Sequence, residues 1–281
     1  MRTRPPLGRT SVRDALDSAV VALTAAGCAT PRLDAELLIA AAMGVSRATV
    51  IADPGRELEP DAAWQFAEWA RRRRSREPIA YILGTKGFRR LDLGVDRRVL
   101  IPRPETEHLV DSALSIPHGA RVVDVGTGSG AVALALKDER PDLVVIGTDA
   151  DPHALDVARA NARRLGIDVE LRHGDLLEPV EGPIDAVLSN PPYVADGERA
   201  ELPADVVRYE PALALFAGAD GLDVISRLIP AAVQRGAQLI ALEVGSTQAA
   251  AVRALMTDAG LTRIEVIPDL AGHDRVVVGR R

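Results

Sequence analysis

The sequence predicts an α/β protein in which a doubly wound, mostly parallel sheet follows a smaller bundle of helices. Up to about residue 85, apolar residues recur at helical spacing. From Ala120 onward, short apolar runs alternate with helical segments, which is the pattern of a mostly parallel sheet. With 281 residues, of which 47% are hydrophobic, the chain is long enough for one large core and a second module.

The first part of the chain contains four predicted helices. Ser11 opens the first helix and Gly27 ends it, and the second helix ends near Gly44. The third helix covers residues 62–74, and a short fourth covers residues 78–83. These segments predict a bundle of three to five helices.

The middle of the chain has a different residue pattern. Apolar residues lie among Gly and Arg over residues 86–105, which suggests a small hairpin or an extended linker. The segment Pro102-Arg103-Pro104-Glu105 breaks this pattern and starts a helix through Leu114. We therefore predict a helical domain over residues 1–85, a hairpin linker over 86–105 and a domain built around the sheet over 106–281.

Strands and helices alternate in the last of these parts. The predicted strands cover residues 121–125, 143–148, 169–172, 186–189, 239–244, 264–267 and 275–278. The predicted helices cover residues 129–137, 221–235 and 247–258, with a further helix that Asp151 caps and Gly166 ends. The last two strands are expected to form a closing antiparallel pair.

Charge and cysteine content exclude several classes of protein. The single cysteine, Cys28, rules out an internal disulfide, and the five histidines show no metal-binding spacing, so no metal is expected. The net charge of −6 is uneven: residues 1–90 carry +5 and residues 91–281 carry −11. This acidity argues against a stable nucleic-acid partner. The run Arg71–Arg74 is either a solvated helix face or a contact for phosphate or an acidic protein.

Two further expectations concern location and assembly. Residues 1–13 are polar and basic and lack the apolar core of a signal peptide. No apolar stretch reaches the roughly 18 residues that a membrane span needs. We therefore expect a cytoplasmic protein without membrane contact, and a monomer by default.

A glycine-rich turn follows the first predicted strand of the sheet. Its residues are Asp124, Gly126, Thr127, Gly128, Ser129 and Gly130. The glycines allow a sharp turn beside a ligand, and the spacing G-x-G-x-G differs from the dinucleotide pattern G-x-G-x-x-G. A carboxylate before the first glycine suits a cationic amino-acid moiety and would repel a pyrophosphate. The turn therefore favours S-adenosylmethionine over a nucleotide phosphate.

Acidic residues follow the next two strands. Asp149, 23 residues after Gly126, is placed to accept both hydroxyls of a ribose. It could instead cap the next helix, although Asp151 is better placed to do so. Asp175, followed by Leu176, lies where an adenine amino group could be held, but a Gly-Asp pair also simply makes turns.

The segment Asn190-Pro191-Pro192-Tyr193 follows the fourth strand, at the edge of the sheet where ligands bind. Two prolines fix the backbone and leave rigidly aimed carbonyls. The Asn190 side-chain oxygen and the Pro191 carbonyl can together accept both hydrogens of a planar NH₂ group, and Tyr193 offers a flat face for stacking. Such acceptors would localise the nitrogen lone pair and aim it at a methylsulfonium, without a general base.

These residues resemble the N-P-P-Y amino-methyltransferases. Together with further segments, they resemble one branch of that group specifically, the release-factor glutamine methyltransferases (the PrmC or HemK family). The further matching segments are residues 77–84, 101–107, 208–213, 220–222, 243–245 and 272–276. The resemblance implies a Rossmann-like class I methyltransferase sheet, a helical domain that helps to dock the release factor, and S-adenosylmethionine as the cofactor. The cofactor would contact residues 126–130, Asp149, Asp175, Leu176 and Asn190, and residues 190–193 would hold the glutamine of a Gly-Gly-Gln motif.

The sequence departs from the family in two places. Some relatives carry an aromatic residue where this chain has Leu176, and an aromatic is common after Phe88, where this chain has Arg89. Three alternatives remain: an N-P-P-Y enzyme that methylates a nucleic-acid base (adenine N6 or guanine N2), a non-catalytic module that binds S-adenosylmethionine, and a nicotinamide dehydrogenase. The acidic catalytic part and the lack of a target-recognition insert disfavour the first. The intact glycine turn with Asn190 disfavours the second, and the glycine spacing disfavours the third.

Overall fold

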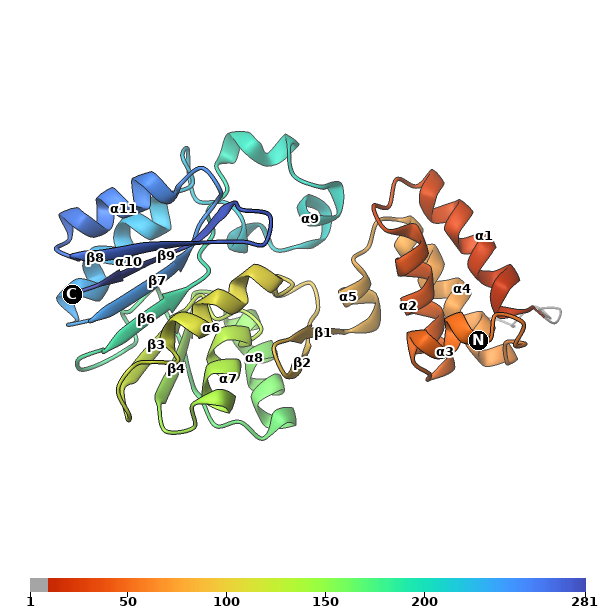
Figure 1. The fold of residues 1–281 in the computed structure, drawn as a ribbon, viewed down its shortest axis with the longest axis horizontal. Helices are drawn as coiled ribbons and strands as arrows, with labels where there is room; N and C mark the ends of the chain where they lie inside the picture. The colour runs from red at the N-terminus through yellow and green to blue at the C-terminus, as the bar shows by residue number, and fades with distance from the viewer. Residues whose placement is uncertain (1–9) are drawn as a thin grey trace. The chain divides into compact units, whose positions relative to one another are not determined.

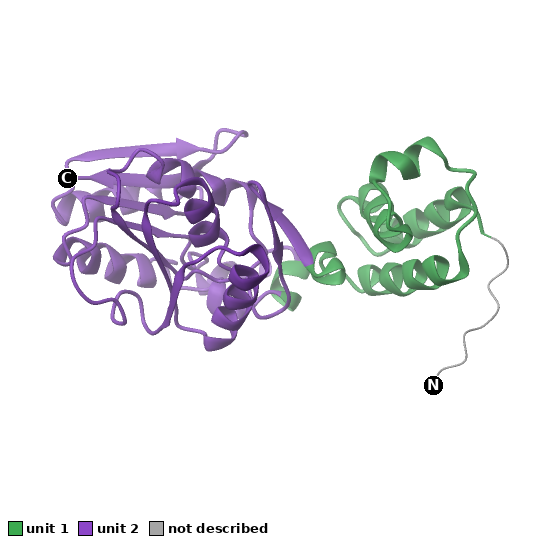
Figure 2. Cartoon of the chain, turned by 90° about the horizontal axis from the view of Figure 1, so that it is seen from below, with its two compact units in different colours: residues 1–84, 204–209 green, residues 85–203, 210–281 purple. Residues whose placement is uncertain are grey.

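The computed structural model describes residues 10–281, so the first nine residues of the predicted helical domain lie outside it. The chain forms two compact units, shown in green and purple in Figure 2. The smaller unit contains the chain up to Gly84 together with Ala204–Tyr209. The larger unit contains Thr85–Pro203 and Glu210–Arg281. The sequence did not anticipate that a segment after residue 200 belongs to the helical unit.

The smaller unit is helical. Its helices are α1 (Val12–Ala25), α2 (Pro31–Met43), α3 (Arg47–Ala52), α4 (Pro60–Arg74), α5 (Ile79–Leu83) and α9 (Ala204–Tyr209). As predicted, Ser11 caps α1, and its side chain accepts a hydrogen bond from the Asp14 amide at 3.2 Å. Gly44 ends α2 in the left-handed conformation that glycine adopts without strain. The short helix α3 was not predicted, because its length is less than two helical turns and shows no clear periodicity.

A buried ion pair lies at the centre of this unit. The Arg73 guanidinium is 7% exposed, and its Nε donates to Asp34 Oδ2 at 2.8 Å. Asp205 of α9 also lies close, with Oδ2 at 3.6 Å from Arg73 Nη1. The Tyr209 hydroxyl donates to the Ser75 carbonyl at 2.7 Å. Polar contacts therefore hold α9 against the end of α4.

Ion pairs within the helical unit involve three of the four arginines in the run Arg71–Arg74. Arg71 pairs with Glu68 at 2.6 Å, and Arg72 pairs with Glu77 at 2.8 Å. Arg73 is buried rather than exposed on a solvated face. Arg72 and Arg73 thus contribute to the internal structure of the helical unit, which the charge pattern alone did not reveal, whereas Arg71 and Arg74 lie on an exposed face as one of the two interpretations predicted.

The larger unit contains a hairpin and a sheet. The hairpin strands are β1 (Thr85–Phe88) and β2 (Leu91–Gly94). The sheet strands are β3 (Arg121–Val125), β4 (Val144–Asp149), β5 (Glu170–His173), β6 (Ala186–Ser189), β7 (Leu239–Glu243), β8 (Arg263–Pro268) and β9 (Asp274–Arg280). The helices are α6 (Glu107–Ala113), α7 (Ala131–Glu139), α8 (Pro152–Leu165), α10 (Asp223–Gln234) and α11 (Ala249–Asp258). Single 3₁₀ turns are η1 (Pro104–Thr106), η2 (Asp196–Ala200) and η3 (Ala212–Ala214).

The strand order in the sheet is β5-β4-β3-β6-β7-β9-β8. The pairs from β5 to β7 are parallel, whereas β9 is antiparallel to both of its neighbours. Helices α6, α7 and α8 cover one face of the sheet, and α10 and α11 cover the other (Figure 1). This confirms the predicted fold class, including the closing antiparallel pair. Because the chain runs from β3 outward to β4 and returns to β6 on the other side of β3, the strand order reverses between β3 and β6, where such sheets bind ligands.

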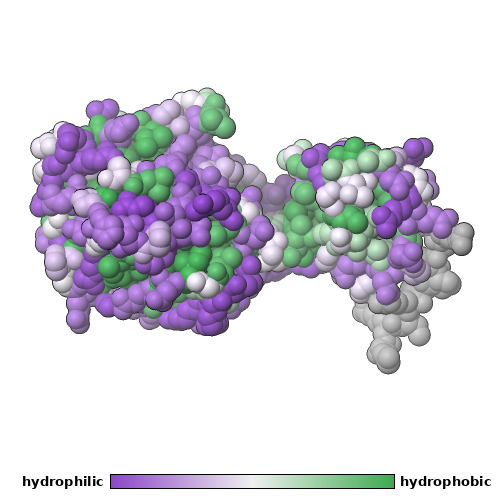
Figure 3. Space-filling view, turned by 60° about the horizontal axis from the view of Figure 1, so that its bottom comes forward, coloured by the Kyte–Doolittle hydropathy of each residue, from purple (hydrophilic) through white to green (hydrophobic). Residues whose placement is uncertain are grey.

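The sheet itself is apolar and buried. The strand residues Val123, Ile146, Val187 and Ile240 are fully buried between the two helical layers. On the face of the larger unit drawn in Figure 3, hydrophilic side chains predominate and apolar ones form separate patches. Among the described residues, no helix combines the length and the apolar character that crossing a membrane requires.

The buried ion pair of the helical unit generates a stability prediction. Asp34→Ala leaves the Arg73 guanidinium buried without its main partner, so we expect a loss of about 3 kcal/mol in the unfolding free energy of this unit. Both tryptophans of the chain, Trp64 and Trp69, lie in α4, so their fluorescence during urea unfolding follows this unit. The control is Asp17→Ala, which removes a 65% exposed partner of Arg32 and should cost less than about 1 kcal/mol. Equal costs for the two variants would contradict the prediction.

Candidate active site

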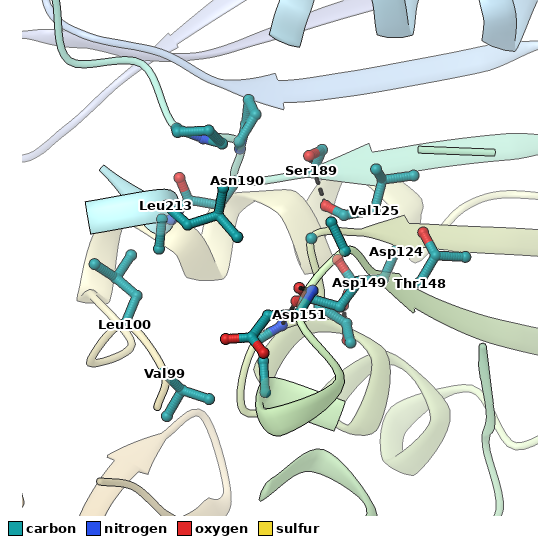
Figure 4. Close-up of a pocket in the computed structure, with 18 of the residues that line it drawn as sticks. Val99, Leu100, Asp124, Val125, Thr148, Asp149, Asp151, Ser189, Asn190 and Leu213 are labelled. Carbon is teal, nitrogen blue, oxygen red and sulfur yellow. Dashed lines mark hydrogen bonds between the residues drawn. The ribbon is translucent and has the colours of Figure 1, made fainter. Parts of the chain in front are cut away.

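A pocket of about 260 Å³ opens at the carboxyl ends of β3, β4 and β6. Asn190 lies on one side of this pocket, and the carboxylates of Asp149 and Asp151 lie on the other (Figure 4). Val99 and Leu100, from the segment after β2, form part of its apolar border. All of the lining residues belong to the larger unit.

The glycine-rich turn forms the floor between β3 and α7. The amides of Gly126 and Thr127 both donate to the Thr148 carbonyl of β4, at 2.8 and 2.9 Å. Gly126 has a φ of 71°, a conformation that strongly favours glycine. Of the predicted cofactor residues in this turn, those from 124 to 129 line the pocket. Gly130 instead caps α7, where an added Cβ would lie 2.9 Å from the side chain of Leu134.

Asp124 is buried beneath this turn. Its Oδ2 accepts a hydrogen bond from the Thr127 hydroxyl at 2.6 Å and another from the Ala133 amide at 3.1 Å. Burial raises the pKa of Asp124 to about 7, although both hydrogen bonds oppose the shift. The carboxyl group thus ties the turn to α7. A cation in the pocket would favour its charged form, which is consistent with the predicted cationic ligand.

Asp149 ends β4 at the rim of the pocket. Its two oxygens accept one backbone hydrogen bond each, from the Gly128 amide and from the Asp151 amide, both at 2.9 Å. Burial raises the pKa of Asp149. The cap of α8 is Asp151, whose side chain accepts from the His153 amide at 2.8 Å. Asp149 therefore does not cap the helix, and each of its oxygens retains a lone pair for a hydroxyl of a bound ligand.

Asp175 and Leu176 lie at the end of the loop after β5 and line the pocket. The Asp175 side chain is 44% exposed and forms an ion pair with Arg227 of α10, a contact that the sequence did not predict. Leu176 has a φ of 48°, which is unusual for a residue with a branched side chain. The Thr148 hydroxyl donates to the Leu176 carbonyl at 2.8 Å and stabilises this conformation.

The corner Asn190–Tyr193 directly follows β6. Ser189, the last residue of that strand, pairs with Val125 in parallel register, and its hydroxyl donates to the Val125 carbonyl at 2.7 Å. This bond holds the corner against the glycine-rich turn. Asn190, Pro191 and Pro192, three of the predicted substrate-binding residues, line the pocket.

Tyr193, which was predicted to stack on the substrate, is not among the residues that line this pocket. Its ring lies beside Gly245, and its hydroxyl is 3.4 Å from Glu243 Oε1. Burial and the neighbouring Glu243 raise the pKa of Tyr193, so its hydroxyl keeps its proton. Its carbonyl accepts from Gln248 Nε2 at 2.9 Å. The contacts with Glu243 and Gln248 thus fix Tyr193 at the end of the corner.

Two polar residues behind the corner were not singled out by the sequence analysis. Thr106, at the end of η1, accepts a hydrogen bond from Asn190 Nδ2 at 3.2 Å. The Thr106 hydroxyl in turn donates to Glu243 Oε2 at 2.6 Å. Burial raises the pKa of Glu243 to about 7. Both residues lie in segments that carried the family resemblance, which was the only signal for them in the sequence.

The arrangement suits a ligand with a cationic part and hydroxyl groups. Backbone amides and apolar side chains surround the pocket, and the carboxyl groups of Asp124 and Asp149 are among the groups that line it. Among residues 10–281, no group of three or more His, Cys, Asp and Glu side chains is arranged to hold a metal ion. The residues therefore fit the predicted cofactor, whose sulfonium and amino groups are positive and whose ribose carries two hydroxyls.

Two family models match the chain. The "PrmC N-terminal domain" matches residues 14–84, and the "Methyltransferase small domain" matches residues 105–209. A release factor glutamine methyltransferase of Koribacter versatilis is 41% identical over 279 residues, covering 96% of this chain and 99% of the relative. One of Cereibacter sphaeroides is 43% identical over 272 residues, covering 95% and 97%.

Solved structures share the fold at low sequence identity. The hMettl16 catalytic domain aligns with a TM-score of 0.55 and 15% identity, over 67% of this chain and 74% of the other. A methyltransferase from Pyrococcus furiosus aligns with a TM-score of 0.52 and 18% identity, over 68% and 88%. These alignments agree with the sheet topology described above.

The two hydrogen bonds of Asp149 lead to a binding prediction. Asp149→Ala removes the predicted acceptor for the ribose hydroxyls, so we expect the affinity for S-adenosylmethionine to fall by about 2 kcal/mol, or roughly 30-fold in Kd. Titration calorimetry measures this directly. The control is Asp156→Ala, which removes a 57% exposed carboxylate from α8 and should change Kd less than about twofold. An unchanged Kd for Asp149→Ala would leave Asp149 with a role in loop structure alone.

Proposed function

The chain belongs to the release factor glutamine methyltransferases, and on this basis we propose how it acts: it transfers a methyl group from S-adenosylmethionine to the side-chain amide nitrogen of the glutamine in the Gly-Gly-Gln motif of peptide chain release factors. The alignments with two of these enzymes, at 41% and 43% identity, span almost the whole length of each relative. This supports both the reaction and the substrate. The observation that carries the proposal is the Asn-Pro-Pro corner at the strand-order reversal, beside the pocket that fits the cofactor.

Substrate orientation is the first contribution of the chain. Because the Asn190 Nδ2 group faces Thr106, its Oδ1 is the atom left for the substrate. We infer that Asn190 Oδ1 and the Pro191 carbonyl each accept one hydrogen of the glutamine NH₂. Pro191 and Pro192 keep the backbone of this corner rigid. The amide nitrogen is then held with both hydrogens fixed and its lone pair facing into the pocket.

Electrostatics make the second contribution. An amide nitrogen is a poor nucleophile because its lone pair is delocalised into the carbonyl. Two fixed acceptors favour the form in which that pair is localised, and they also stabilise the positive charge that develops on the nitrogen during alkylation. S-adenosylmethionine, when bound, supplies an electrophilic methyl group on its sulfonium. The alkylated nitrogen is strongly acidic and loses its proton readily, so no side chain has to act as a base beforehand.

The residues around the cofactor have separate roles in this proposal. The backbone of residues 126–129 surrounds the amino-acid part of the cofactor, while Gly130 caps α7, and Asp124 supplies the balancing charge. Asp149 accepts the ribose hydroxyls, and residues 175–176 border the adenine. Tyr193 anchors the end of the corner through Glu243 and Gln248, and it does not line the pocket. In this proposal Asn190 contacts both the cofactor and the substrate.

The remaining expectations complete the proposal. The helical unit would help to dock the release factor, and the division of the chain at residues 85 and 105 stays a prediction. Because release factors act on cytoplasmic ribosomes, we propose a cytoplasmic enzyme. We further propose that it works as a monomer with no stable nucleic-acid partner. The net charge of −11 over residues 91–281 supports the last point, since a nucleic-acid backbone would be repelled.

A labelling experiment tests the substrate. Purified protein with radiolabelled S-adenosylmethionine should transfer label to an unmethylated release factor, and mass spectrometry should place the methyl group on the glutamine of the Gly-Gly-Gln peptide. DNA and ribosomal RNA serve as parallel substrates and should remain unlabelled. Label on a nucleic-acid base, with none on the release factor, would contradict the proposal.

Loss of the Asn190 amide tests the mechanism. Asn190→Ala removes one of the two acceptors, so kcat should fall by about a hundredfold or more, as happens when a preorganised polar contact is lost. Cofactor affinity should change only modestly. The control is Gln234→Ala, which deletes an exposed amide at the end of α10 and should retain full turnover. Near-normal turnover by Asn190→Ala would remove this residue from the mechanism.

A further inference from the structure

We propose that Thr106 and Glu243 are positioning residues, which fix the Asn190 amide in the orientation that leaves its oxygen free for the substrate. This inference rests on the proposed function, because it concerns how the acceptor of that reaction is aimed. Thr106 and Glu243 do not themselves contact the substrate in this proposal. They act through Asn190, to which they are connected by hydrogen bonds behind the corner.

The direction of the hydrogen bonds carries the argument. A charged carboxylate can only accept hydrogen bonds, so the Thr106 hydroxyl must donate to Glu243 Oε2 across their 2.6 Å contact. A hydroxyl has one proton, and this contact uses it. Toward Asn190, Thr106 can therefore only accept. The Asn190 atom 3.2 Å away must be the donor Nδ2, and Oδ1 must face the other way.

Burial makes this arrangement selective. Thr106 borders the pocket but is only 4% exposed, and Glu243 is 2% exposed, so bulk water has little access to replace a lost partner. If the Asn190 amide turned over, its oxygen would face the lone pairs of Thr106, and its NH₂ group would face the pocket. That NH₂ group would then face the NH₂ group of the substrate. Both groups are hydrogen-bond donors, so neither would have an acceptor there. The buried pair therefore disfavours the unproductive orientation.

The same carboxyl group also holds the far end of the corner. Glu243 Oε1 lies 3.4 Å from the Tyr193 hydroxyl, a longer contact than the one to Thr106. Ser189 pairs with Leu242 in parallel register, so the next residues along the two strands, Asn190 and Glu243, are neighbours at the sheet edge. One buried carboxylate thus supports both the first and the last residue of the corner.

Burial has the largest effect on the pKa of Glu243 and raises it, and the neighbouring groups modify this effect. Glu105 raises its pKa and Arg275 lowers it, while hydrogen bonds from Thr106 and Tyr193 also lower it. With burial included, the pKa is about 7. Kinetics are therefore measured at pH 8, where the charged form that can only accept hydrogen bonds predominates.

The variants separate positioning from folding. Thr106→Val keeps the side-chain shape but removes the hydroxyl, and we expect kcat to fall about 10- to 100-fold, the scale at which misplacing a reacting group slows catalysis. The KM for the release factor and the Kd for S-adenosylmethionine should change less than about threefold, because neither ligand touches this hydroxyl in the proposal. Thr106→Ser restores the hydroxyl and should recover most of kcat.

Two further variants sharpen the comparison. Glu243→Gln should lower kcat at least as much as Thr106→Val, and the double variant should lose little more than Glu243→Gln alone, because the two residues act in series. The control is Ser112→Ala, which removes another buried hydroxyl, one that donates to the Leu109 carbonyl within α6. It should leave kcat within about threefold of the wild type.

The possible outcomes are distinguishable. If the wild-type protein labels no release factor, the proposed function fails. If the wild-type protein is active and Thr106→Val keeps its kcat, or if the two losses multiply in the double variant, the positioning role is wrong. A crystal structure of Thr106→Val at a resolution that distinguishes amide oxygen from nitrogen gives an answer that needs no substrate: the Asn190 amide should occupy both orientations. A single, unchanged orientation of the Asn190 amide in that variant would overturn the inference.

Discussion

The parallel pairing of β6 with both β3 and β7 is the constraint on which the rest of the site depends. Val125 pairs with Ser189, and Ser189 pairs with Leu242, so these three strands end at the same level of the sheet. The next residues along the chain are Gly126, Asn190 and Glu243, of which Glu243 is the last residue of β7. Segments more than fifty residues apart in the chain are thereby brought to one edge, where a turn, an acceptor and its support lie together.

Burial of acidic groups accompanies this arrangement. Asp124 and Glu243 are both almost inaccessible, and burial raises the pKa of each to about 7. Such groups are costly to bury unless hydrogen bonds hold them, and each accepts at least two. In the proposed mechanism neither side chain is needed as a base, because the alkylated amide is acidic enough to lose its proton unaided. Asp124 links the glycine-rich turn to α7 by hydrogen bonds, and Glu243 accepts from Thr106 and Tyr193 beside the corner.

Features that depend on local sequence could be predicted, and those that depend on distant contacts could not. Short local segments encode the glycine turn, the cap at Asp151 and the corner at residues 190–193. The alternation of strand and helix patterns along the chain predicted the sheet. Helix α3 was too short to show a period. The pairing of Arg73 with Asp34 joins residues 39 positions apart, and that of Thr106 with Glu243 joins residues 137 positions apart. Nothing in the local pattern around any of these four residues indicates its partner.

The most direct test of the account is a crystal structure of the protein with S-adenosylhomocysteine and a Gly-Gly-Gln peptide. The central claim is that a rigid corner holds the glutamine NH₂ with its lone pair facing the position of the transferred methyl group. The account predicts that the glutamine nitrogen lies within hydrogen-bonding distance of both Asn190 Oδ1 and the Pro191 carbonyl, and faces the cofactor sulfur. A glutamine bound elsewhere in the pocket, or an Asn190 oxygen turned toward Thr106, would contradict it.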